Sequence, residues 1–225
     1  MNKGQYIYMD PPKRLAEEKK DLTRKAIQKA AKKVFFEKGY LNTTIAEIAK
    51  LAGVAKGSIY LYFQTKDDLY LSLMLPILKE IQASMTTIYQ SLSQGEIRSA
   101  QDFINRYLKH YLRIYHFDPD GIRIIQAFQL GDLISAMSEK NREELNQMAK
   151  ENFQLSRRIF AKLIKDKLIA KRDYIQLSDT FWSTFIGVIQ LEESKLRLTG
   201  KNHIEETLKT ALSLLGKGLE PDKPA

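Results

Sequence analysis

Proline and glycine are sparse in this chain, and they separate segments in which apolar side chains recur with the period of an α-helix. These breaks do not bound the short stretches of alternating polarity that are typical of β-strands. The sequence therefore predicts an all-α fold, with Pro76 bending or interrupting one long helix. Helices are expected over about residues 13–38, 44–52, 56–62, 65–90, 99–116, 119–137, 139–168, 174–198 and 203–215.

The length of the chain and the residue types that it lacks exclude several classes of protein. A chain of 225 residues can bury a core without disulfides or metals. The absence of cysteine excludes a disulfide framework, thiolate metal sites and cysteine nucleophiles, and it fits a reducing compartment. No apolar run is as long as a bilayer span, and the first residues lack the apolar core of a secretory signal. We therefore expect a cytoplasmic protein.

Basic residues are concentrated near the N-terminus. Residues 1–70 contain 14 Lys and Arg against 8 Asp and Glu, a net charge of +6, whereas the other 155 residues contain 22 against 19, a net charge of +3. Such a patch suits a polyanionic partner, because each neutralised phosphate releases condensed counterions. Well-solvated lysine-rich helices would explain the same charge equally well.

The first seventy residues have the pattern of a helix-turn-helix. A basic amphipathic helix that ends at Gly39 is followed by Thr44 and Glu47, which have the spacing of a capping box at the start of a short second helix. Gly53 can adopt the left-handed conformation that a sharp turn needs, and a third short helix follows. This arrangement is typical of DNA-binding proteins in which the last of the three helices enters the major groove.

The third helix carries the residue types that contacts with DNA require. Gly57 permits close approach of the backbone, Lys56 supplies charge, and hydroxyl groups can bond phosphates or base edges. The hydroxyl groups belong to Ser58, Tyr60 and Tyr62. The apolar side chains expected to face the core and hold the helix at its angle are Val54, Ile59 and Phe63.

The stretch from Gly39 to Met74 resembles the N-terminal DNA-binding domain of the TetR family of bacterial transcriptional regulators. The matching residues are Gly39, Thr43, Thr44, Ile48, Ala49, Ala52, Gly53, Val54, Gly57, Tyr60, Tyr62, Phe63, Lys66 and Leu69. The resemblance implies a DNA-binding set of Thr43, Thr44, Lys56, Gly57, Ser58, Tyr60, Tyr62 and Lys66. It also implies phosphate contacts for Thr44, Tyr60, Tyr62 and Lys66, and positions nearest the bases for Lys56, Gly57 and Ser58. Ala55 departs from the family, which often has Ser or Thr there, so a helix cap worth about 0.5 to 2 kcal/mol is missing.

Several of these residues also have a purely structural explanation. Tyr60 and Tyr62 could be packing residues, Thr44 could cap its helix without touching DNA, and Lys66 could be a solvated charge. Because a lysine at a helix N-terminus is unfavourable for the helix dipole, an external anion would explain Lys66. The sequence favours DNA contacts for Tyr60, Lys66, Ser58 and Thr44.

The resemblance also implies how the whole protein is organised. We expect a tail and helix extension (1–20), a helix-turn-helix DNA-binding domain (21–67), a helical effector-binding and dimerisation domain (68–218) and a tail (219–225). The helices at about 174–198 and 203–215 are expected to form a homodimer, whose two heads bind a palindromic double-stranded operator with half-sites about 34 to 36 Å apart or a multiple of that. Gly187, which costs a helix about 1 kcal/mol relative to alanine, suggests close approach of another backbone.

The resemblance further implies a small-molecule effector that releases the protein from its operator. We predict a repressor, with activation as the alternative, in a bacterial cytoplasm and associated with the nucleoid, and with no cofactor, metal site or membrane contact. Aromatic residues that could line an effector pocket are Phe103, Tyr107, Tyr111, Phe128, Phe153, Trp182 and Phe185. Few charges accompany them, which favours an apolar or aromatic effector. Packing in the core would explain any one of these rings as well.

Two other classes of function are alternatives to a regulator. An enzyme is disfavoured because His110, His116 and His203 lack metal-ligand spacing, and because the chain has no glycine-rich phosphate cradle and no nucleophile elbow. The sequence from Asp118 to Gly121 lacks the further ligands of a calcium loop and is better interpreted as a helix-starting turn. An all-α adaptor that dimerises without binding DNA is the third class.

Overall fold

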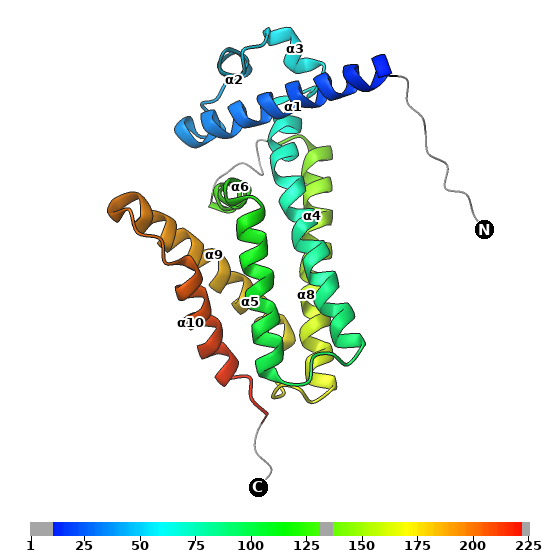
Figure 1. The fold of residues 1–225 in the computed structure, drawn as a ribbon, viewed down its shortest axis with the longest axis vertical. Coiled ribbons are helices and arrows are strands. Elements are labelled where there is room, and N and C mark those ends of the chain that lie inside the picture. Colours follow the sequence, from blue (N-terminus) through cyan, green and yellow to red (C-terminus); the bar gives the residue numbers. More distant parts are fainter. Residues whose placement is uncertain (1–10, 131–136, 222–225) are drawn as a thin grey trace, which may run out of the picture. The chain divides into compact units, whose positions relative to one another are not determined.

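The computed structural model describes residues 11–130 and 137–221, and every regular element within these ranges is a helix (Figure 1). The helices are α1 (Pro11–Lys38), α2 (Ile45–Ala52), α3 (Lys56–Tyr60), α4 (Lys66–Ser93), α5 (Ala100–Phe117), α6 (Pro119–Leu130), α8 (Glu139–Lys165), α9 (Tyr174–Thr199) and α10 (Ile204–Lys217). The prediction of an all-α fold is confirmed. The described chain divides into two compact units, one containing residues 11–73 and 137–141 and the other containing residues 74–130 and 142–221.

The first unit is built around the inward face of α1. Ile27 of this helix is fully buried, and the ring of Phe35 packs edge-on against Tyr70 of α4 at a centroid distance of 5.1 Å. Tyr40 completes the cluster, with its ring 5.8 Å from Phe35 and 5.2 Å from Tyr70. Gly39 ends α1, because its φ of 74° is left-handed and its N–H donates to the carbonyl of Phe35 at 2.9 Å.

Helix α4 continues through Pro76, so the predicted interruption does not occur. Proline has no N–H, and Pro76 therefore leaves the carbonyl of Ser72 without its usual helical donor. Gln28 of α1 supplies a substitute, because its side-chain amide donates to this carbonyl at 3.3 Å and to Ser72 Oγ at 3.1 Å. A tertiary hydrogen bond thus satisfies the group that the proline leaves unpaired.

The second unit has an aromatic core formed by α5, α8 and α9. Phe103, Phe160 and Phe181 come one from each helix and are fully buried, with Phe160 lying 5.4 Å from Phe103 and 4.9 Å from Phe181 between ring centroids. Helix α10 packs closely against α5, because a Cβ added at Gly216 would lie 2.8 Å from Ile104 Cγ1. Glycine at this position is what allows the two helices to approach.

Two helices end earlier than the sequence predicts. Helix α3 stops at Tyr60 instead of residue 62, and α8 stops at Lys165 instead of residue 168. The end of α8 is set by Lys167, whose φ of 58° is left-handed. The N–H of Leu168 then donates to the carbonyl of Leu163 at 3.0 Å, which closes the last turn.

The ends of the described ranges bear on two other expectations. The helix expected over residues 119–137 is present as α6, and its predicted continuation over residues 131–136 lies outside the described residues. The tail expected from residue 219 begins with a buried side chain, since Leu219 is 3% exposed and its carbonyl accepts the N–H of Ala170 at 2.8 Å.

The described residues contain neither a membrane-spanning helix nor a cluster of metal ligands. No helix within residues 11–130 and 137–221 is both long and apolar enough to cross a membrane. The same part of the chain contains no group of three or more His, Cys, Asp or Glu side chains that could hold a metal ion.

Candidate functional site

The first unit contains the helix-turn-helix that the sequence predicts. Thr44 begins α2 with a complete capping box: its Oγ1 accepts the N–H of Glu47 at 3.3 Å, and Glu47 Oε2 accepts the N–H of Thr44 at 2.9 Å. Gly53 ends α2 with a φ of 69°, and the N–H of Val54 donates to the carbonyl of Ala49 at 3.1 Å. The predicted start and stop of α2 are confirmed, and they set the direction in which the chain enters α3.

Helix α3 has one face in the core and one face outward. Ile59 is fully buried, and Phe63, just beyond the helix, is 4% exposed. On the outward side Lys56 and Gly57 are exposed, and Tyr60 keeps 46% of its surface accessible. A positive charge, an uncovered stretch of backbone and a phenol hydroxyl therefore lie on the accessible side of one short helix.

The start of α3 lacks a side-chain cap, as the sequence predicts. Ala55 occupies the cap position and makes no side-chain hydrogen bond there, although its carbonyl accepts the N–H of Ser58 at 2.9 Å. Ser58 and Tyr62 are partly buried. Because so short a helix is marginal in water on its own, α3 depends on the packing of Ile59 and its neighbours for order.

Lys66 is held inside the unit, so the alternative that it is merely a solvated charge is wrong. Its Nζ donates to the carbonyl of Tyr40 at 2.8 Å and to that of Thr43 at 3.1 Å, and it lies 4.2 Å from the centre of the Tyr40 ring. Burial of the ammonium group lowers the pKa of Lys66 from its ordinary value. The side chain ties the start of α4 to the loop between α1 and α2. Its contact with a DNA phosphate stays a prediction.

Thr43 is buried where the resemblance implies a DNA contact. The residue is 2% exposed, and its Oγ1 donates to the carbonyl of Gly39 at 2.7 Å. The hydroxyl thereby donates to a carbonyl at the end of α1, so the structure does not support a contact through this side chain. Thr44, in contrast, is exposed. It lies beside Glu47, whose pKa is lowered to about 2 by the hydrogen bond from Lys38 and by those from Thr44.

Two carboxylates at the start of α4 bind the segment that begins α8. Asp67 accepts the hydroxyl of Tyr40, and it also accepts the N–H of Ser138 at 2.7 Å. Asp68 accepts the side-chain amide of Asn141, also at 2.7 Å, and Asn141 is 3% exposed. We call this group of Asp67, Asp68, Ser138 and Asn141 the α4–α8 clasp. Sequence reasoning missed it, because the contacting residues are more than 70 positions apart in the chain.

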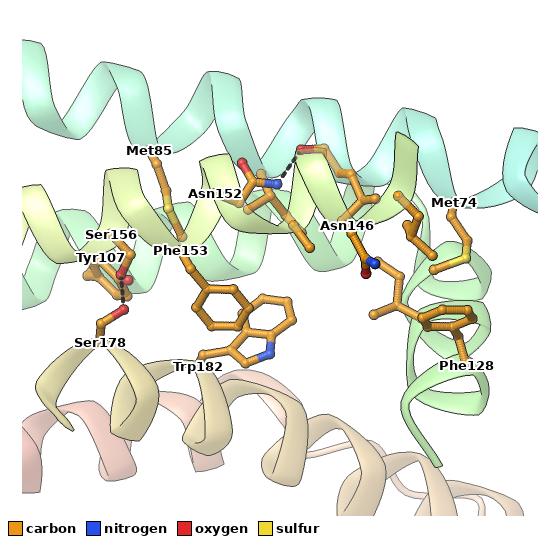
Figure 2. Close-up of a pocket in the computed structure, with 15 residues that line it drawn as sticks. Met74, Met85, Tyr107, Phe128, Asn146, Asn152, Phe153, Ser156, Ser178 and Trp182 are labelled. Carbon is orange, nitrogen blue, oxygen red and sulfur yellow. Dashed lines mark hydrogen bonds between the residues drawn. The ribbon is translucent and has the colours of Figure 1, made fainter. Parts of the chain in front are cut away.

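The second unit contains a cavity of about 110 Å³. Its lining residues are Met74, Leu78, Ile81, Met85, Tyr107, Ile125, Phe128, Leu145, Asn146, Ala149, Asn152, Phe153, Ser156, Ser178 and Trp182, none of which is charged. Figure 2 shows Phe153 and Trp182 together near the middle of the view, with Tyr107 and Ser178 toward one end and Met74 and Phe128 toward the other. An engineered apolar cavity of about 150 Å³ holds benzene, so this space suits a group about the size of one aromatic ring.

Polar side chains in the cavity wall are held in fixed positions. The amide of Asn152 donates to the carbonyl of Leu78 at 3.0 Å, and Ser178 Oγ donates to Ser156 Oγ at 2.8 Å (Figure 2). Asn152 Oδ1 is buried and has no partner among the described residues. A buried acceptor without a partner lowers stability by about 1 to 3 kcal/mol. Among the lining residues, Asn152 is thus the one with a buried side-chain oxygen that lacks a hydrogen-bond donor.

The structure separates the seven aromatic residues predicted for an effector site into two groups. Tyr107, Phe128, Phe153 and Trp182 line the cavity. Phe103, Tyr111 and Phe185 are fully buried and are not among the lining residues; Tyr111 stacks on Phe185 with ring centroids 4.2 Å apart. Contact of the first group with an effector stays a prediction.

Sequence reasoning missed the contribution of α4 to the cavity wall, and from α8 it identified only Phe153. Asn152 and Ser156 lie one turn apart on α8, in a row that continues with the buried Ile159 and Leu163. Two polar residues in an otherwise apolar row of a helix are a pattern that could have identified Asn152 and Ser156 as lining residues.

Comparison with known proteins shows what the first unit is similar to. Residues 27–73 match the family model described as bacterial regulatory proteins, tetR family. This segment of the chain is therefore similar to the DNA-binding segment of TetR-family regulators. A curated relative, the HTH-type transcriptional regulator YhgD of Bacillus subtilis (strain 168), is 42% identical over 59 residues, which are 26% of this chain and 31% of that protein. The aligned segment thus spans about a third of the relative's length.

Solved structures extend the TetR likeness in fold to the rest of the chain. The TetR-family regulator PfmR from Thermus thermophilus has a TM-score of 0.69 and 21% identity, covering 86% of this chain and 98% of that one. The regulator FadR from Bacillus subtilis, in complex with stearoyl-CoA, has a TM-score of 0.64 and 21% identity, covering 87% of this chain and 98% of that one. The helices beyond residue 73 therefore follow a TetR-family fold.

Proposed function

We propose that the chain is a ligand-responsive transcriptional repressor that binds a palindromic operator as a homodimer and is released by a small apolar or aromatic effector. The observation that carries the proposal is the outward surface of α3, preceded by a capped α2 and a left-handed turn at Gly53. This surface offers Lys56, Gly57 and Tyr60 to a partner, while Ile59 anchors the helix in the core. An exposed helix with these groups suits the major groove of DNA.

The residues assigned to DNA contacts are Thr44, Lys56, Gly57, Ser58, Tyr60, Tyr62 and Lys66. Lys56, Gly57 and Ser58 take the positions nearest the bases, and the exposed hydroxyl of Tyr60 takes a phosphate. Lys66 has one ammonium hydrogen left beyond the two that it donates to the carbonyls of Tyr40 and Thr43. Its phosphate contact is therefore compatible with its role in holding the loop.

The homodimer is proposed to form through the exposed faces of α9 and α10. Leu191 and Leu198 of α9 are 56% and 83% exposed, and Leu214 of α10 is 63% exposed. Gly187 lies one turn before Leu191, and a Cβ added there would meet no described atom within 4 Å. Because the chain itself supplies no close neighbour for this glycine among its described residues, a second subunit is the partner that we assign to it.

The effector is proposed to occupy the cavity of the second unit. No charged residue lines the cavity among the described residues, which favours a neutral ligand. FadR from Bacillus subtilis was solved with stearoyl-CoA, but the phosphates of such a ligand would meet no cation in this cavity wall. A compact neutral ligand with an aromatic ring or a short apolar group fits better.

Two helices could transmit the presence of an effector. Met74 and Leu78 of α4 and Leu145 of α8 line the cavity, and the same helices begin at the α4–α8 clasp of the first unit. A ligand that changes the spacing of α4 and α8 would act on the hydrogen bond between Asp68 and Asn141. Release of DNA requires only that the ligand favour a conformation that binds the operator poorly.

The experiment that tests the function is selection of bound duplexes from a random DNA pool by the purified protein at a stated salt concentration. Recovery of one palindromic sequence is the expected result. Tyr60→Phe, which removes only the phenol hydroxyl, should weaken binding to all sequences, whereas Ser58→Ala should change the selected sequence. No enrichment above non-specific binding, with a dimer observed by light scattering, would favour the adaptor hypothesis instead.

A further inference from the structure

A large apolar side chain stands on the DNA-facing surface proposed above without any packing role. Leu61 is 79% exposed. It directly follows the last residue of α3, Tyr60, and precedes Tyr62, and both tyrosines are less exposed than Leu61. Single exposed leucines are common on protein surfaces and need no explanation by themselves. Leu61 differs from such leucines because it lies on the side of α3 opposite the buried Ile59.

Helical spacing places Leu61 on the outward side of α3. Residues four apart share a face of a helix, and residues two apart lie on nearly opposite faces. Leu61 therefore continues the face of Gly57, opposite Ile59, which is fully buried. A Cβ at Gly57 would meet no atom within 4 Å. Because Gly57 has no side chain, Leu61 is the one of these two residues that presents a side chain on this face.

The chemistry of leucine limits what it can recognise in a major groove. Its side chain has no hydrogen-bond donor or acceptor, so the polar edges of the bases offer it nothing. The one apolar group that the four base pairs present in the major groove is the 5-methyl group of thymine. Phosphates are the other partners of this surface, and the ammonium group of Lys56 and the phenol hydroxyl of Tyr60 can donate hydrogen bonds to them.

We propose that Leu61 contacts the 5-methyl group of a thymine in each half-site and thereby selects for that base. The inference rests on the proposed function, since it assumes that the outward face of α3 lies in the major groove. It adds to the DNA-binding set a residue that reads a base through an apolar contact.

The test replaces each thymine of the selected operator in turn by deoxyuridine, which lacks only the methyl group. The protein should lose about fourfold in affinity per half-site at one thymine position, which is the effect of returning one buried methyl group to water. Leu61→Ala should bind the unmodified operator more weakly and lose the response to deoxyuridine at that position alone. Leu41→Ala provides the matched control, because Leu41 is 65% exposed but lies outside α3.

The outcomes separate this inference from the proposed function. A selected operator that tolerates deoxyuridine at every position would overturn the role of Leu61 and leave the regulator intact. An equal deoxyuridine effect in the original protein and in Leu61→Ala would also overturn it. Recovery of no operator at all would overturn the proposed function and this inference together. Circular dichroism of Leu61→Ala is the control measurement that checks whether the variant is folded.

Discussion

The replacement Lys66→Met removes an ammonium group and keeps a long, apolar side chain. In the structure that group donates two hydrogen bonds to main-chain carbonyls, those of Tyr40 and Thr43, and it lies over the Tyr40 ring. Hydrogen bonds from a charged donor contribute about 1.5 to 3 kcal/mol each. Two such bonds would therefore set an upper range of about 3 to 6 kcal/mol.

Two effects reduce this range. Burial of the ammonium group has a cost of its own, which is why the pKa of Lys66 is lowered. The site is also partly exposed, so water can replace the lysine at the vacated carbonyls. We expect a net loss of about 1 to 3 kcal/mol in the stability of the first unit.

Amide hydrogen exchange measures this loss where it occurs. The amides of Ile48 and Ala49 in α2 report on the first unit, and their exchange should become faster by roughly tenfold for each 1.4 kcal/mol lost. Fluorescence of Trp182, the sole tryptophan of the sequence, reports on the second unit and should not change. Lys56→Met, which removes an exposed lysine, is the matched control.

One result would refute this reasoning. If Lys66→Met binds DNA more weakly while the exchange of Ile48 and Ala49 stays unchanged, the ammonium group acts on a phosphate and does not hold the loop. If exchange becomes faster in Lys66→Met but not in Lys56→Met, the structural role is established whatever the effect on DNA.

Three further perturbations probe other parts of the chain. Ala55→Ser adds the missing cap of α3, worth about 0.5 to 2 kcal/mol, so operator affinity should rise by roughly 2- to 30-fold; unchanged affinity would mean that α3 is fully ordered before it binds. Burial lowers the pKa of His110 to about 3, so the unfolding free energy should fall by about 1.4 kcal/mol per unit as the pH drops from about 6.5 toward 3. His110→Gln should flatten this acid limb in urea titrations, and a slope equal to that of the original protein would argue against the burial effect. Gly216→Ala places a Cβ 2.8 Å from Ile104 Cγ1 and should cost about 1 to 3 kcal/mol in thermal unfolding. Gly187→Ala, which meets nothing within 4 Å, should not destabilise the subunit, and equal losses in the two variants would contradict the packing argument.

Local features of the fold could be predicted where the responsible atoms are close in sequence. The capping box of Thr44 and Glu47 and the left-handed Gly53 involve neighbouring residues, so the sequence predicted both ends of α2. The start of α4 has a capping pair of the same local kind: Asp68 Oδ2 accepts the N–H of Thr65 at 2.9 Å, and Thr65 Oγ1 accepts the N–H of Asp68 at 3.0 Å. The departure of Ala55 from the family's usual Ser or Thr also predicted that α3 would lack a side-chain cap.

Features that depend on distant partners could not be predicted in this way. The carbonyl that Pro76 leaves free is satisfied by Gln28, and the ammonium of Lys66 is held by carbonyls of the loop that contains Tyr40. The cavity wall combines residues from α4, α5, α6, α8 and α9. Helical periodicity says which residues share a face, but not which other helix covers that face or in what register.

The sequence by itself determined where the helices lie, both ends of α2 and the kind of surface that α3 presents, because capping, backbone conformation and periodicity act over a few residues. The tertiary structure decided which of those residues stay accessible. Thr43 is buried, Lys66 donates hydrogen bonds to two main-chain carbonyls, and Leu61 is exposed. The tertiary structure also separated the rings that line the cavity from those that fill the core. Accessibility and pairing depend on contacts across the fold, and these are set by packing between segments far apart in the chain.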